Sequence, residues 1–250
     1  MMRYTALEFY KIRHKKILLM IVFLLCIELF WAFMAGSISL SRDPDAVSWE
    51  VIITFITQMN GLFLPILTAV VVSRICDMEH KGNTWKMLMT ASVKREQIYA
   101  AKYMCACLLI LFVIVLQLVA TVVFCQSKSV TSPIPWELLI QTAMGTLVTS
   151  MAVIALQQWI SLAITNQAFA LCLGMLGGFI GITASLFPGM VRYFFIWSYY
   201  NELSPIVMRY IDSSVVYVTR GLSFPFAGGL LLFSVLLYTV GNFYVCRKEV

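Results

Sequence analysis

Six long apolar stretches alternate with shorter polar ones along the chain. Each is close to or longer than the about 20 residues that an α-helix needs to cross a bilayer. The pattern therefore predicts six membrane-spanning helices, at residues 17–36, 51–75, 103–125, 136–163, 168–187 and 224–246. The fourth and fifth are separated only by Thr165, Asn166 and Gln167, and this short polar break predicts a helical hairpin.

Composition indicates that the apolar character extends over the whole chain. Hydrophobic residues make up 61% and charged residues 12% of the 250 residues, and the mean hydropathy is +0.88. A soluble domain carries roughly 25% charged residues. We therefore predict an all-α integral membrane protein forming one domain over residues 1–250. The seven cysteines include no C-x-x-C pair, so we expect neither a disulfide framework nor a metal site.

The distribution of positive charge predicts the orientation of the chain. With the N-terminus placed inside, 13 of the 18 Lys and Arg residues fall in inner segments and five in outer ones. Inner loops of membrane proteins are enriched in Lys and Arg. Both termini are therefore predicted to be cytoplasmic, and the even number of spans agrees with their lying on the same side. The first apolar run is longer than that of a cleaved signal peptide, so we expect it to remain as the first span.

Residues 1–16 show the pattern of an amphipathic helix lying on the inner leaflet, in contact with membrane lipids. Its apolar positions share one side: Met2, Ala6, Phe9, Tyr10 and Ile12. Its polar positions are expected on the opposite side: Glu8, Lys11 and Lys15. The alternative is a merely basic anchor without helical structure.

Residues 76–102, between the second and third spans, are unusually polar for this chain. Met78, Gly82, Trp85 and Met89 recur at helical spacing and predict a helix across the membrane surface. A break near Ser92 precedes a second helix that runs into the third span. By pattern alone, an ordinary surface helix explains this stretch equally well.

The pattern E-x-x-G-x-x-W-x-x-L-x-T-A-S-x-x-R-x-x-I-x-x-x-K, from Glu79 to Lys102, resembles the first cytoplasmic loop of type-two ABC exporter permeases. That family often has proline where Ser92 stands. The resemblance implies that this loop holds a coupling helix resting in a groove of the ATPase subunit. The implied contact residues are Glu79, Gly82, Trp85, Leu88, Thr90 and Arg95.

The same resemblance implies the partners of the chain. The sequence contains no G-x-x-x-x-G-K-[ST] loop, so ATP and Mg would bind to separate ABC ATPase subunits and this chain would bind no cofactor itself. A second permease chain, identical or homologous, would be needed to enclose a path. The implied location is the bacterial cytoplasmic membrane.

The stretch FFIWSYYNELSPI, around Trp197 and Pro205, is similar to lantibiotic-immunity and bacitracin-type permeases. This finer resemblance implies export or clearance of antimicrobial peptides, with an amphipathic peptide or a lipid-linked molecule as substrate. Two alternatives stay open: a structural or sensory membrane subunit, and an ABC exporter of another lipid-like substrate.

Polar and small residues inside the spans are candidates for a substrate path. The second span carries such a stripe at helical spacing, and Glu28 is the one acidic residue well inside a span. We expect Glu28 to be protonated or paired with Gln58 or another amide. The candidate path residues are Glu28, Thr54, Gln58, Gly61 and Pro65. Ordinary helix packing is the alternative for the stripe, and it is the favoured explanation for the G-x-x-x-G pairs of the fifth span.

The segment 188–223 is predicted to be extracellular and is rich in aromatic residues. Aromatics at this depth usually belong to the interfacial belt. A sharper hypothesis is a pair of short helices that form an outer gate, with Trp197, Glu202 and Asp212 as its candidate residues. The two carboxylates either attract a basic peptide or simply face solvent.

Other function classes lack the residues they need. An intramembrane enzyme requires convergent groups such as paired carboxylates or a histidine cluster, and the spans contain one mid-span carboxylate and no mid-span histidine. We therefore predict no catalytic residues and no metal ligands. The net charge of +6 belongs to the inner side of a membrane protein, so no nucleic-acid partner is expected.

The predicted orientation can be tested by cysteine labelling. In intact cells, a membrane-impermeant maleimide should modify a cysteine placed at Ser127 or Asp212, but not one placed at Asn83 or Glu249. The parent chain gives the background from native cysteines, and permeabilised cells should allow labelling at all four positions. Labelling at Asn83 in intact cells would contradict the orientation inferred from the positive charges.

Overall fold

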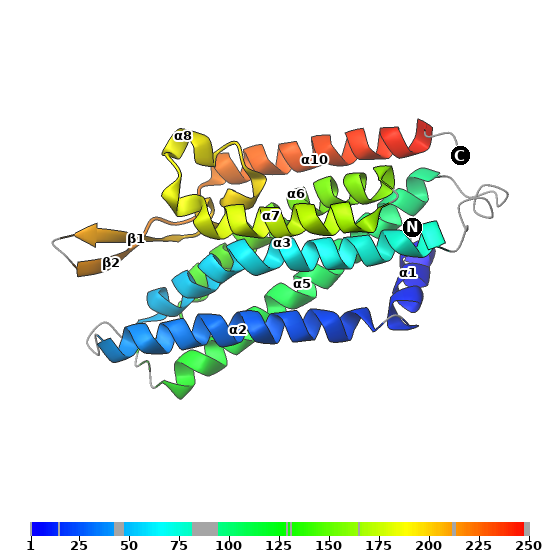
Figure 1. Cartoon of the computed structure of the whole chain (residues 1–250). Helices are drawn as coiled ribbons and strands as arrows, with labels where there is room; N and C mark the ends of the chain where they lie inside the picture. Colours follow the sequence, from blue (N-terminus) through cyan, green and yellow to red (C-terminus); the bar gives the residue numbers. More distant parts are fainter. Residues whose placement is uncertain are drawn as a thin grey trace.

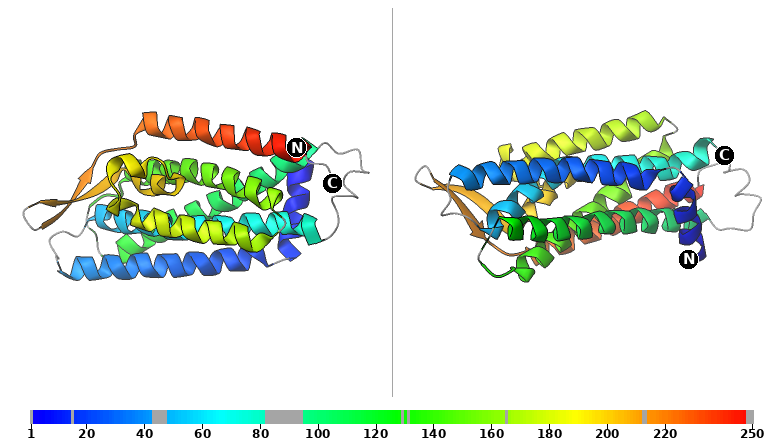
Figure 2. Two further views of the ribbon diagram at one scale, coloured as in Figure 1. Left: turned by 45° about the horizontal axis from the view of Figure 1, so that its top comes forward. Right: turned by 90° about the horizontal axis from the view of Figure 1, so that it is seen from below.

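The computed structural model describes residues 2–14, 16–42, 48–81, 95–128, 130, 132–164, 166–211 and 214–247. Six long helices lie side by side in an elongated bundle, a short helix crosses one end, and a β-hairpin extends from the other (Figure 1). Figure 2 shows the same arrangement from two further directions. Both ends of the described chain lie at the end crossed by the short helix. The molecule therefore has two distinct ends. We call the end crossed by the short helix the inner end and the opposite one the outer end, after the orientation predicted from the positive charges.

The six long helices confirm the predicted spans. They are α2 (Ile17–Arg42), α3 (Trp49–Lys81), α5 (Arg95–Ser127), α6 (Trp136–Ala163), α7 (Gln167–Thr183) and α10 (Phe224–Arg247). All six are long and apolar enough to cross a membrane. α5 starts earlier than its apolar stretch, so the helix that follows the polar segment continues directly into the third span, as predicted. With 33 residues, it is about 50 Å long and extends beyond a hydrocarbon core of about 30 Å.

The break between α6 and α7 is short, as the sequence predicts. The N–H of Ile164 donates to the carbonyl of Ile160 at the end of α6. Asn166 then caps α7, its side-chain oxygen accepting from the N–H of Ala168 at 3.0 Å. An Asn cap satisfies one of the backbone donors that a helix start leaves free.

Glycines bring α3 and α7 into close contact. Gly181 of α7 lies directly against the backbone of Gly61, and a Cβ added to Gly178 would lie 2.5 Å from the carbonyl oxygen of Leu62. Gly174 lies one turn further along the same contact, against Ala69. Because glycine has no Cβ, the two backbones approach more closely than larger residues would allow. The packing role predicted for these glycines is confirmed.

Helix α1 (Met2–His14) lies across the inner end of the bundle and packs mainly against α5. Its helical structure confirms the prediction, but the predicted placement of Glu8 and Ile12 on opposite sides of the helix is wrong, because both are buried against the bundle. Glu8 is 5% exposed and Ile12 1%, whereas the apolar Leu7 and Tyr10 are 52% and 65% exposed. The periodicity identified an amphipathic helix correctly. It missed that a cation on another helix would satisfy Glu8 inside the protein.

The outer segment contains short helices and a β-hairpin. The helical turns are η2 (Ala184–Leu186), α8 (Gly189–Arg192), η3 (Ile196–Ser198) and α9 (Tyr199–Glu202). Strands β1 (Ile206–Ile211) and β2 (Ser214–Thr219) then pair antiparallel, with Ile206 opposite Thr219. The predicted short helices are present, but the hairpin was not predicted. Both runs are rich in Val, Ile, Tyr and Thr, which favour strands over helices.

The α3–α7 contact predicts a position-specific effect of added side-chain volume. Gly181→Leu should destabilise the folded protein by about 1–3 kcal/mol, because the new side chain meets backbone that cannot move aside. Thermal unfolding of the purified protein in detergent measures the effect. Gly228→Leu in α10 is the control, because nothing lies within 4 Å of the Cβ it would add. Equal melting temperatures for the two variants would show that the contact does not require glycine.

Candidate functional site

A cavity of about 600 Å³ lies near the outer end of the bundle. Its walls come from the outer half of α3, the end of α7 and the outer segment, including the first residues of β1. The lining residues are Thr54, Thr57, Gln58, Met59, Ile182, Ser185, Arg192, Tyr193, Asn201, Glu202, Ser204, Ile206, Val207, Met208 and Arg220. Polar and apolar side chains both face the space, which therefore suits an amphipathic molecule better than a purely apolar one.

The charged groups of the cavity are held by neighbouring atoms. Arg192 Nη1 donates to Glu202 Oε1 at 3.0 Å. The Arg220 guanidinium donates to the carbonyl of Ser204 at 3.1 Å and to that of Glu202. Arg192 Nε is buried and has no hydrogen-bond partner among the described residues. With two arginines and one glutamate, these groups carry a net positive charge, and Glu202 already has a cationic partner.

Three contacts fix the outer segment on the bundle. The Asn201 amide donates to the carbonyl of Gly181 at 2.9 Å. The hydroxyls of Tyr200 and Ser150 lie 3.1 Å apart within hydrogen-bond distance. Trp197 packs directly on Gly177 of α7. The cavity wall thus rests on the same helix that contacts α3. Burial also raises the pKa of Tyr200 above its usual range, so its hydroxyl stays protonated.

The three predicted gate residues have different surroundings. Trp197 is 9% exposed and belongs to the core rather than to the cavity lining. Glu202 lines the cavity. Asp212 lies outside the described residues. The structure therefore places one of the three at the cavity, and the gate itself stays a prediction.

A cluster of polar side chains lies deep in the bundle, where α2, α3 and α5 meet. The Gln117 amide donates to Glu28 Oε1 and to Asn60 Oδ1, both at 2.9 Å. All three residues are buried, and Glu28 Oε2 has no hydrogen-bond partner among the described residues. The expectation that an amide pairs with Glu28 is confirmed, but the amide is that of Gln117 rather than Gln58. A buried carboxylate needs such donors because no water is available in the hydrocarbon region.

Sequence reasoning missed Gln117 and Asn60, although a signal for both was present. Each interrupts a long apolar run, and a polar residue inside a span usually faces protein or water rather than lipid. What the pattern could not show was that the two amides and Glu28 converge from three different helices.

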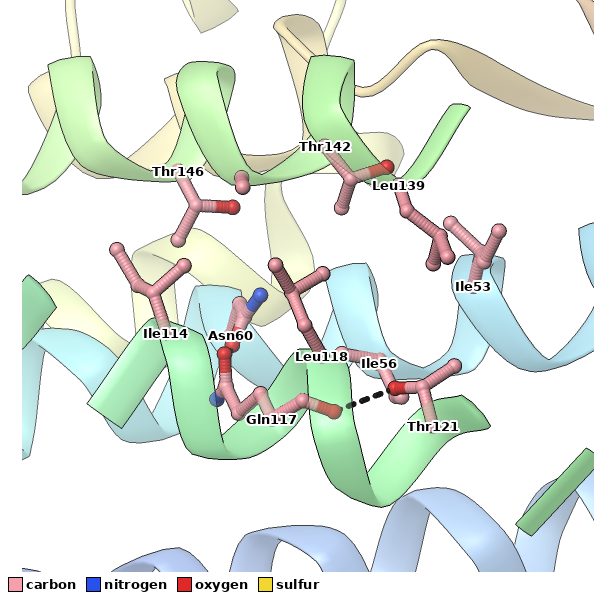
Figure 3. Close-up of a pocket in the computed structure, with 11 residues that line it drawn as sticks. Ile53, Ile56, Asn60, Ile114, Gln117, Leu118, Thr121, Leu139, Thr142 and Thr146 are labelled. Carbon is pink, nitrogen blue, oxygen red and sulfur yellow. Dashed lines mark hydrogen bonds between the residues drawn. The ribbon is translucent and has the colours of Figure 1, made fainter. Parts of the chain in front are cut away.

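A small cavity of about 20 Å³ lies beside this cluster, between α3, α5 and α6 (Figure 3). Asn60, Gln117 and Thr146 contribute polar atoms, and Thr121 turns its hydroxyl to the carbonyl of Gln117 at 2.7 Å. A space of this size is comparable to the volume that one water molecule requires. It is therefore too small for a substrate.

The five candidate path residues do not form one surface. Thr54 and Gln58 line the outer cavity. Gly61 contacts Gly181, and the carbonyl of Pro65 faces Gly174, so these two take part in packing against α7. Glu28 lies in the buried cluster with Gln117 instead. The stripe thus divides into a cavity-lining outer part and a packing inner part.

Only the last of the predicted coupling residues can be placed with its side chain. Arg95 begins α5 and donates from Nη1 to the carbonyl of Cys246 in α10 at 3.2 Å. Glu79 lies in the final turns of α3. The other four, Gly82, Trp85, Leu88 and Thr90, lie outside the described residues.

Comparison with known proteins identifies the family. The model of the ABC-2 family of transporter proteins matches residues 5–181. These include most of α1, four complete spanning helices, most of a fifth and the polar segment between α3 and α5. No curated protein matches the chain. Since the match covers more than two thirds of the 250 residues, the chain belongs to the ABC-2 transporter family and is the membrane-spanning permease of an ABC transporter that works with an ABC ATPase.

Proposed function

We propose that this permease clears amphipathic antimicrobial peptides, of the lantibiotic or bacitracin-like kind, from the bacterial cytoplasmic membrane. The observation that carries the proposal is the outer cavity, with its mixed polar and apolar walls. A cavity of about 600 Å³ is within the range of small-molecule binding sites and holds a few side chains of a peptide rather than all of it. The energy would come from ATP bound with Mg on the separate ATPase subunits.

The proposed coupling site lies at the opposite end from this cavity. α1, the end of α3, the start of α5 and the end of α10 all lie at one end of the bundle (Figure 1). This arrangement supports a cytoplasmic location for both termini and for the segment between α3 and α5. We propose that this segment contacts the ATPase through Glu79, Gly82, Trp85, Leu88, Thr90 and Arg95.

The proposed transport path involves a second permease chain. The outer cavity has a volume of about 600 Å³ and the small buried cavity one of about 20 Å³. Of these two, the cavity that is large enough for part of a substrate lies near the outer end and does not by itself cross the bundle. Many apolar side chains on the bundle surface are exposed in the single chain, as expected for faces that meet lipid or another membrane helix. We propose that an identical or homologous permease completes the path along one such face.

An exporter of another lipid-like substrate is the second candidate. The specific observation in its favour is the charge of the outer cavity, where Arg192 and Arg220 outnumber Glu202. Both arginine side chains line this cavity, and a guanidinium group binds an anionic headgroup by charge-assisted hydrogen bonds. A cationic peptide would instead have to compete with Arg192 for Glu202. The charge dependence of transport therefore distinguishes the two substrates.

The coupling role of the polar segment predicts the effect of added bulk. Gly82→Trp should leave the permease in the membrane but abolish its association with the ATPase, because the large side chain blocks a close approach. Co-purification of the two subunits measures this association. The matched control is Gly228→Trp on the exposed side of α10, which should keep the ATPase bound. If the Gly82 variant associates with the ATPase and is active as normal, the segment is only a surface helix and has no coupling role.

Substrate identity can be tested by expression of the permease with its ATPase in a sensitive bacterium. Tolerance to a lantibiotic or a bacitracin-like peptide should rise. Glu202→Gln should lower the tolerance gained against cationic peptides by up to about fivefold, the size expected for one partly exposed charge interaction.

The control for Glu202 is Glu137→Gln. Glu137 lies on the first turn of α6, outside the cavity, and its carboxylate accepts from Gln141 at 3.0 Å. This variant should keep full tolerance. Unchanged tolerance across a peptide panel, with the complex in the membrane and hydrolysing ATP, would remove the peptide assignment. Increased export of anionic lipid-like substrates by the Glu202→Gln variant would favour the second candidate, because the substitution frees Arg192 from its partner.

A further inference from the structure

A buried ion pair joins α1 to α5 at the inner end of the bundle. Lys102 Nζ lies 3.2 Å from Glu8 Oε2, and the two residues are 1% and 5% exposed. The second carboxylate oxygen of Glu8 contacts Lys11 Nζ at 2.9 Å. Around them, Ile12, Ile75 and Cys105 belong to the main apolar core. Two opposite charges are thus held together away from water.

Lys102 also bonds to the helix on the other side of the polar segment. Its Nζ donates to the carbonyl of Ile75 in α3 at 3.1 Å. Lys102 lies seven residues, or about two turns, after Arg95 at the start of α5. It therefore connects the helix before the proposed coupling segment, the helix after it, and α1.

The chain turns sharply between α1 and the first span. Lys16 has a φ of 54°, a left-handed backbone conformation that non-glycine residues seldom adopt. α2 begins at the next residue, Ile17, which is fully buried in the same core. A displacement of α1 would therefore be transmitted to the start of α2, which carries Glu28 further along.

Stability alone does not account for an ion pair in this position. Removing two charges from water costs several kcal/mol per ion, and well-packed apolar residues often replace such pairs without loss of stability. In some proteins, a buried polar or charged contact also fixes the geometry of the helices that carry it. That property suits a contact that must transmit the displacement of one helix to another without a change in their relative position.

We propose that Glu8 and Lys102 are positioning residues that make α1 move as one body with the base of the coupling segment. A displacement imposed by the ATPase on this segment would pass through Lys102 to Glu8, and from α1 around Lys16 into α2. The inference rests on the proposed ATPase contact of the segment, and it adds the route by which the first span responds.

Spin labels test this connection without any transported substrate. In the complete permease–ATPase complex, labels on non-canonical residues at the exposed positions Tyr10 of α1 and Met104 of α5 report the distance between the two helices. This distance should stay the same between nucleotide-free and ATP-trapped complexes. In the double variant Glu8→Leu/Lys102→Met, ATP trapping should change it.

Two outcomes would overturn the inference. A nucleotide-dependent distance in the unaltered chain would show that α1 does not move with α5. A constant distance in the double variant would show that the ion pair does not join them. If the double variant does not fold, Glu8→Gln replaces it, because the amide keeps the shape of the side chain and removes its charge.

Activity gives a second, independent measurement. The double variant should keep ATP hydrolysis within about twofold while peptide tolerance falls roughly two- to thirtyfold, the range seen for residues that carry coupling between sites. Lys11→Met is the matched control, since Lys11 also contacts Glu8 but is 40% exposed. This control should keep both activities.

Full peptide tolerance in the double variant would show that the pair is only a structural contact, and would overturn the proposed connection. Absence of tolerance in the unaltered complex would remove the peptide assignment, but the label distances would still decide whether α1 and α5 move together. Failure of the inference and failure of the proposed substrate are thus distinguishable.

Discussion

The close contact between α3 and α7 determines the arrangement of the outer half of the molecule. Gly61 and Gly181 bring the two backbones together, and the carbonyl of Gly181 then accepts from Asn201. Trp197 packs on Gly177 one turn away. The outer segment is therefore built on α7, and the cavity lies where that segment faces α3. A side chain at Gly181 would displace the helix and with it one wall of the cavity.

Inside the bundle, the cost of burying polar atoms decides which helices face one another. Glu28, Asn60 and Gln117 come from three helices and satisfy each other by hydrogen bonds. Threonine hydroxyls such as that of Thr57 bond to carbonyls of their own helix and need no outside partner. Residues of the first kind specify which helices meet, while those of the second kind can lie on any buried face.

The inner end differs because it combines charge with burial. The Glu8–Lys102 pair and the bond from Lys102 to the Ile75 carbonyl gather α1, α3 and α5 around the polar segment. The outer end holds its ion pair, Arg192–Glu202, in a partly open cavity. Solvent weakens charge interactions at an open site and leaves them strong at a closed one. The inner pair is thus suited to hold geometry, and the outer pair to exchange partners.

The sequence by itself determined the six spans, the amphipathic N-terminal helix and the glycine contacts, because these follow from local hydropathy and from residue size. It also carried the pattern from Glu79 to Lys102 that resembles the family now identified. Only the tertiary structure decided that Glu8 faces inward, that Gln117 rather than Gln58 meets Glu28, and that residues 206–219 form a hairpin at the cavity. These features depend on partners distant in sequence, and a periodic pattern along one helix carries no information about what the neighbouring helix presents.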